Sequence, residues 1–207
     1  MEHFYFFKNK ASYITTYKTS ILRLLNSKEI AFIIIMAVSG FVLATFVSQV
    51  TKMITGIPGS NYLCCIFLAI YTSFSLLIHE GKRGRFFLQY ALFTVLIIPT
   101  FLGGPPFDVL ARLNFFLTAF IIDLVFNSLY KIFKNTNKIK WWTTSGTLLF
   151  WVMLPFFSII IKPLFFPNQY ISVFVSTISA LMPLIIIQAI AGGFIGYNIY
   201  HRTKKVF

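Results

Sequence analysis

The chain has 207 residues, of which 57% are hydrophobic and 11% are charged, and its formal net charge is +13. A soluble domain contains about 25% charged residues, and a globule of this size has too little interior to bury so many apolar side chains. The composition therefore excludes a soluble enzyme, a disordered tail and a disulfide-stapled secreted module, and it predicts an integral membrane protein.

Six apolar stretches follow one another along the chain. A helix needs about 20 mostly apolar residues to cross a bilayer, and the second and third stretches are the shortest of the six. We predict an all-α integral membrane protein, a single bundle of six transmembrane helices. The expected spans are 30–50, 61–78, 86–101, 109–130, 141–161 and 170–200. A basic segment, 1–29, precedes this domain of residues 30–200, and a basic tail, 201–207, follows it.

The positive charges are divided unevenly between the loops. Fifteen of the 18 Lys and Arg residues fall in the first segment, the second and fourth loops and the tail, whereas only Lys52 and Lys162 fall in the alternate loops. Because cytoplasmic loops retain Lys and Arg, this alternation predicts an even number of crossings with both termini in the cytoplasm. The charges form no single patch, which argues against nucleic-acid binding as their purpose.

The first 29 residues have no early apolar core followed by a small-residue cleavage site, so we expect no removable signal peptide. Residues 4–25 fit either a basic amphipathic helix on the inner membrane surface or an irregular segment.

The fourth span has a stripe of polar residues on an otherwise apolar helix. Asp108, Arg112, Asp123 and Asn127 fall within about 100° of one another at 100° per residue. A charge in a bilayer is costly, so the stripe is expected to face protein or a wet cavity. Arg112, near the outer end, either grips an anionic group or pairs with Asp108. Asp123 either makes a buried hydrogen bond to a neighbouring helix or binds a ligand.

Other polar residues fall near the expected outer face. A small-molecule site combines an apolar wall with a few polar groups, so these side chains are candidates for a pocket under the outer loops. The predicted substrate-binding residues are Arg112, Asp108, Asn61, Tyr62, Lys162, Asn168, Gln169 and Tyr170.

Two spans contain small residues at helical spacing. Gly192 and Gly196 form a GxxxG motif in the last span, and Ala37, Gly40 and Ala44 form a second stripe in the first. Small residues let helices approach closely in lipid. Each stripe either packs inside the bundle or docks a partner. Gln188, beside the GxxxG motif, is expected to bond across to the fourth span, and Asp123, Asn127 and Gln188 are grouped as structural polar residues.

Motifs for an enzyme are missing from the sequence. It contains no Walker A, HExxH or GxSxG motif, and no pair of acidic residues is placed for two-carboxylate or two-metal chemistry. The adjacent Cys64 and Cys65 lie in an apolar run and indicate helix side chains rather than a metal site. We expect a non-enzyme without metal or cofactor. A membrane enzyme acting on lipids or prenyl groups is the weaker alternative.

The six-span outline, the first span AFIIIMAVSGFVLATFV, the outer IPGS, the late Asp in FIIDLVFN and the closing IIIQAIAGGFIGYNIYHRTKK are similar to those of a known family. The chain resembles the substrate-binding S-components of energy-coupling factor (ECF) vitamin transporters. The resemblance covers most of residues 28–207. The MreD membrane family, which acts in rod-shape determination, has a similar outline and is the rival.

The resemblance implies a subunit that binds a vitamin-like small molecule near the outer face. It implies partners as well: the lipid bilayer, a membrane T-component and two cytoplasmic ATPases. Ala37, Gly40 and Ala44 match the family's docking stripe by position. The metal-transporting branch needs an outward-facing His near the start, and His3 precedes a segment expected inside. We therefore expect a vitamin-like solute, no nucleic acid, and residence in the plasma membrane of a prokaryote.

Overall fold

The computed structural model describes residues 25–203 except 57–59, 105 and 165–167, and it places the side chains of these residues except 60, 61 and 168–170. The described chain is helical and contains no strand. Its elements in order are α2 (Ser27–Thr55), η1 (Ser60–Cys64), α3 (Cys65–His79), α4 (Arg85–Ile97), η2 (Leu110–Arg112), α5 (Leu113–Ile121), η3 (Ile122–Phe126), η4 (Asn127–Leu129), α6 (Tyr130–Asn135), α7 (Ile139–Ile161), η5 (Lys162–Leu164) and α8 (Asn168–Thr203).

Five helical segments of the described chain are long and apolar enough to cross a membrane. They are Ser27–Thr55, Tyr62–His79, Leu110–Asn135, Ile139–Leu164 and Ile171–Thr203. Each matches a predicted span to within a few residues, so the prediction of a helical membrane protein is confirmed at this level.

The predicted third span corresponds to α4, which is shorter than expected. Its 13 residues are about 20 Å long at 1.5 Å per residue, whereas the hydrocarbon core is about 30 Å thick. The helix ends at Ile97 because Pro99, two residues later, has no N–H to continue the hydrogen-bond ladder. The predicted end at residue 101 is therefore wrong. With α4 there is a sixth apolar helix, but it is shorter than a helix that crosses a membrane.

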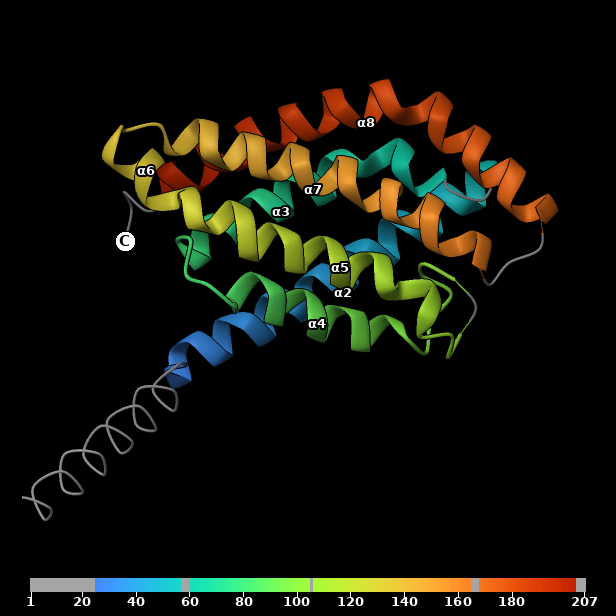
Figure 1. The fold of residues 1–207 in the computed structure, drawn as a ribbon, viewed down its shortest axis with the longest axis horizontal. Helices are drawn as coiled ribbons and strands as arrows, with labels where there is room; N and C mark the ends of the chain where they lie inside the picture. Colours follow the sequence, from blue (N-terminus) through green and yellow to red (C-terminus); the bar gives the residue numbers. More distant parts are fainter. Residues whose placement is uncertain (1–24, 57–59, 105, 165–167, 204–207) are drawn as a thin grey trace, which may run out of the picture.

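Consecutive long helices run in opposite directions (Figure 1). The start of α2, the α3–α4 loop, the α6–α7 connection and the end of α8 consequently lie at one end of the bundle, which we call the basic end. The opposite end, which we call the far end, contains the end of α2, residues 98–104 and 106–109, and the end of α7. The predicted division of the charges follows this geometry, while the side of the membrane on which each end lies stays a prediction.

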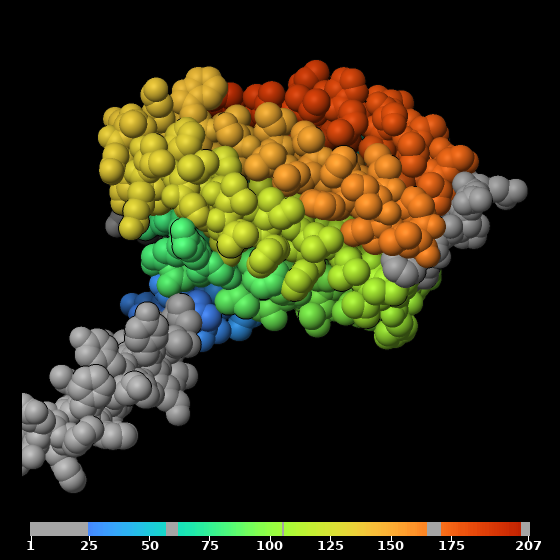
Figure 2. All heavy atoms as spheres, viewed as in Figure 1, coloured from blue at the N-terminus to red at the C-terminus, as the bar shows by residue number. Residues whose placement is uncertain are grey.

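The GxxxG stripe of α8 packs inside the bundle. A Cβ added at Gly192 would lie 2.5 Å from the Ala69 Cβ on α3, and one added at Gly193 would lie 2.8 Å from the Thr144 Cα on α7. The backbones of these three helices therefore meet directly. Figure 2 shows α7 and α8 side by side along one face of the molecule. Of the two roles predicted for this stripe, packing within the chain is the one observed.

Candidate functional site

Arg112 is fully buried at the far end, where its guanidinium binds backbone carbonyls. Its Nε donates to the Ile97 oxygen at 3.1 Å, and Nη2 donates to the Thr100 and Gly104 oxygens at 2.5 and 3.3 Å. Nη1 donates to the Asp108 oxygen. These carbonyls belong to the end of α4 and the loop that follows it. Arg112 therefore supplies donors to a helix end whose carbonyls have no partner within the helix.

Asp108 contributes to the same end in a different way. Its Oδ1 accepts hydrogen bonds from the N–H groups of Leu110 and Ala111 at 3.1 and 3.2 Å, as an N-terminal capping residue does. The predicted ion pair between Asp108 and Arg112 is not formed: the guanidinium bonds to the Asp108 backbone oxygen, and the carboxylate is directed to the start of η2.

Asp123 holds the other end of α4. Its Oδ2 accepts a hydrogen bond from the backbone N–H of Gly84, the residue before α4, at 2.5 Å, and its Oδ1 accepts one from Asn127 Nδ2 at 2.5 Å. Arg112, Asp123 and Asn127 are 0%, 5% and 3% exposed. The prediction that these three face inward is confirmed. A carboxylate therefore lies at the positive end of α4 and a guanidinium at its negative end.

The other predicted pocket residues divide into two groups. Tyr62 and Lys162 are buried, with Tyr62 edge-on to Trp151 at 6.3 Å between ring centroids and Lys162 Nζ 3.9 Å from the centroid of Phe174. The remaining side chains fall outside the part that the structure describes. They are those of Asn61, Asn168, Gln169 and Tyr170.

A cavity lies between α2, α3, α4, α5 and α7. Its volume is about 40 Å³, and Gly40 and Ala44 of α2 form part of its wall. None of the predicted substrate-binding side chains that the structure places, Arg112, Asp108, Tyr62 and Lys162, lines it. Half of its lining residues are aromatic: Tyr71, Tyr90, Phe93, Phe115, Phe150 and Trp151.

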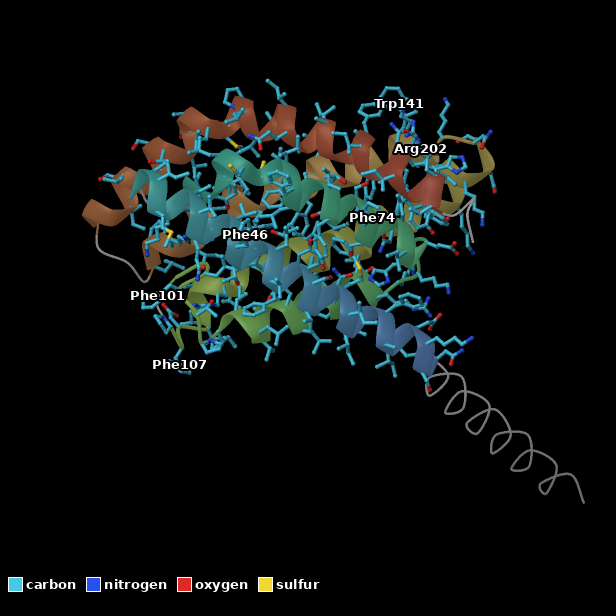
Figure 3. The ribbon with its side chains drawn as sticks, turned by 180° about the vertical axis from the view of Figure 1, so that it is seen from behind. Phe46, Phe74, Phe101, Phe107, Trp141 and Arg202 are labelled. Atoms are coloured by element: carbon cyan, nitrogen blue, oxygen red, sulfur yellow. The ribbon has the colours of Figure 1, made fainter. Side chains whose placement is uncertain are left out.

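The stripe of Ala37, Gly40 and Ala44 lies inside the bundle and not on its surface. Ala37 and Ala44 are 1% and 6% exposed, and a Cβ at Gly40 would lie 2.5 Å from the Tyr71 hydroxyl. The prediction that this stripe presents a free docking face is corrected, because α3 packs against it. The outward face of α2 carries large apolar side chains instead, including Phe46 (Figure 3).

A buried hydrogen-bond network joins α2, α3 and α4 beside the cavity. Gln89 Oε1 contacts Ser75 Oγ at 2.6 Å and His79 Nε2 at 2.7 Å, while Gln89 Nε2 donates to the Tyr71 hydroxyl at 2.6 Å. That hydroxyl donates to the Met36 carbonyl. This network was not predicted from the sequence. Its sequence signal is Gln89, a polar residue near the start of the third apolar stretch.

Gln188 bonds to the second predicted span and not to the fourth. Its Oε1 accepts from the Ile66 N–H at 2.8 Å, and its Nε2 donates to the Leu63 carbonyl at 2.9 Å. The predicted partner was wrong because α8 packs on α3 along its length. Gln188 supplies a donor and an acceptor to the backbone where η1 passes into α3.

Among the residues whose placement is described, no group of three or more His, Cys, Asp or Glu side chains is arranged to hold a metal ion. Comparison of the chain with family models, with curated proteins and with solved structures finds no match.

Proposed function

We propose that this chain is the solute-binding membrane subunit of an ECF-type uptake transporter. It binds a vitamin-like small molecule from the outer face, and separate T-component and ATPase subunits drive the transport. In this proposal the protein lies in the plasma membrane of a prokaryote with both termini in the cytoplasm. It performs no catalysis itself.

The observation that carries the proposal is the aromatic cavity inside the bundle. Six aromatic side chains from four helices line it, and the hydroxyls of Tyr71, Thr72 and Tyr90 add polar groups to its wall. A concave, mostly apolar space with a few polar groups is typical of small-molecule sites. The resemblance of the six-helix outline to S-components supplies the transport role.

Ligand binding is tested by thermal unfolding of the purified protein in detergent against a panel of vitamins. A ligand at 100 times its Kd adds about 2.7 kcal/mol to stability. Ala44→Leu places a larger side chain into the cavity wall and is expected to remove that stabilisation, whereas Val42→Leu, on the exposed face of the same helix, is expected to keep it. A panel without any stabilising compound would contradict the proposal.

A second candidate is a structural or assembly subunit of the MreD type, without ligand. The observation that favours it is that Arg112 and Asp123, the best sequence candidates for binding, bond to the backbone of α4. Copurification from the native membrane separates the two: ATPases and a T-component support the transporter, and a complex lacking ATPases supports the structural subunit.

A further inference from the structure

Lys162 differs from the other lysines of the described chain because its side chain is buried. Its side chain lies at the end of α7 and is only 7% exposed. Among the described residues its Nζ has no hydrogen bond and no ion pair, and it lies 3.9 Å from the centroid of the Phe174 ring. The other far-end lysine, Lys52, is exposed and lies 5.7 Å from the centroid of Phe101.

The charges around Lys162 make its burial unfavourable. Arg112 is close enough for its positive charge to repel the ammonium. Asp108, the acidic residue at this end, directs its carboxylate to the N–H groups of Leu110 and Ala111. The ring of Phe174 offsets part of the cost of burial through a cation–π contact. Buried charges are usually paired with an opposite charge, and the Lys162 ammonium has no such partner among the described residues.

The inner face of α7 connects Lys162 with the cavity. Ser158, Leu154 and Trp151 follow it at helical spacing towards the middle of the helix, and all three are buried. Leu154 and Trp151 line the cavity. Two further polar atoms along this route are buried without a partner in the described chain, Trp151 Nε1 and the Oδ1 of Asn114, whose Nδ2 donates to Ser158 Oγ at 2.5 Å.

We propose that Lys162 is the anion-recognising group of the solute site, and that the solute is an amphipathic anion. A carboxylate or phosphate pairs with the ammonium, and the apolar body of the solute lies along the inner face of α7 towards Trp151. This inference names the substrate class of the proposed binding subunit and so rests on that function.

The test uses the full chain in detergent with four acid and neutral pairs: biotin and biotinamide, pantothenate and pantothenol, lipoate and lipoamide, nicotinate and nicotinamide. We expect at least one acid to raise the unfolding temperature of the wild type while its neutral partner does so about tenfold less tightly or not at all. Lys162→Met removes the charge but keeps the length of the side chain, and it is expected to abolish the preference for the acid. Lys162→Arg and the matched control Lys52→Met are expected to keep it.

A second arm places the protein in nanodiscs of phosphatidylcholine with or without phosphatidylglycerol, because a lipid headgroup offers the same anionic chemistry. Stabilisation by phosphatidylglycerol alone would overturn the inference. Equal binding of an acid and its neutral partner, or an acid preference that survives in Lys162→Met, would overturn the anion site but leave the proposed solute binding intact. Failure of every compound to bind would overturn both. If Lys162→Met does not fold, loss of acid binding in Lys162→Gln gives the same readout.

Discussion

Arg112 and Asp123 are charged side chains in an apolar segment, and each bonds to the backbone of a neighbouring helix. The guanidinium donates to carbonyls at the end of α4, and the carboxylate accepts the N–H before its start. Within a membrane no water replaces such partners, so each unsatisfied backbone group is costly. These two residues are therefore explained by the needs of α4, whatever ligand the protein binds.

At Arg112 we expect a large loss of stability on substitution. Arg112→Met removes the donors to the Thr100 and Gly104 oxygens, which costs about 1–3 kcal/mol for the two lost hydrogen bonds. The Ile97 oxygen also loses the guanidinium but keeps its hydrogen bonds from the N–H and the hydroxyl of Thr100. Thermal unfolding in detergent measures this loss. Asp108→Asn, a change at the half-buried capping residue beside it, is the control and is expected to cost under about 1 kcal/mol because an Asn side chain also caps helices. Equal effects of the two substitutions would contradict the role assigned to Arg112.

The inward-facing polar stripe could be predicted from the sequence, but its partners could not. Helical spacing places Arg112, Asp123 and Asn127 on one face, and the cost of charge in lipid directs that face inward. The partners lie on α4 and its flanking loops, and no spacing rule relates them to the fourth span. The same reason explains why Gln89 and its contacts to α2 and α3 were missed.

At the scale of elements, α4 is the helix that depends most on its neighbours. It is only 13 residues long and ends two residues before Pro99, while Arg112 of η2 and Asp123 of η3 hold its two ends. Short helices are marginal without tertiary contacts. We infer that α4 depends on its two end contacts and on the Gln89 network for its position.

This dependence predicts that Arg112→Met and Asp123→Ala are not additive. If either substitution releases α4 as a unit, the second removes contacts that are already lost, and the double variant is destabilised by less than the sum of the single ones. Hydrogen exchange of the α4 amides is expected to rise in each single variant, and that of the α8 amides to change little. Full additivity, with α4 protected from exchange, would show that its two ends act independently.

The contact between α3 and α8 gives a second prediction at this scale. Gly192→Leu introduces a side chain where even a Cβ would lie 2.5 Å from the Ala69 Cβ, so we expect a loss of about 1–3 kcal/mol through overpacking. Ile195→Leu, at an exposed position of the same helix, is the control and is expected to be neutral. A stable Gly192→Leu variant would mean that α8 is free to move away from α3.

Five of the six predicted spans were placed approximately, because each long helix requires a long apolar stretch, and the remaining one, the third, corresponds to the shorter α4. The end of the third was not placed correctly, although Pro99 was visible in the sequence, because the apolar residues continue past it. The cavity was missed for another reason. Apolar residues that line a cavity, fill a core or face lipid have the same composition, and only the packing of five helices distinguishes them.

At the scale of the whole molecule, the proposed topology depends on how the chain crosses the membrane. The alternating directions of the helices place the α3–α4 loop and the α6–α7 connection at the basic end, and residues 98–104 and 106–109 at the far end (Figure 1). Phe101 and Phe107 project from the far end and are each 76% exposed (Figure 3). Because α4 is shorter than a usual transmembrane helix, the proposed topology depends on whether the chain crosses the membrane between the α3–α4 loop and the far end.

Cysteine labelling in intact cells tests that step most directly. In a background with Cys64→Ser and Cys65→Ala, a single cysteine is placed at Arg83, at Phe107 or, as a control, at Lys138 on the α6–α7 connection. We predict that a membrane-impermeant maleimide labels Phe107→Cys from outside, and that it labels Arg83→Cys and Lys138→Cys only after the membrane is permeabilised. Labelling of Arg83→Cys and Phe107→Cys from the same side would contradict the account, because α4 would then enter and leave the membrane on one face.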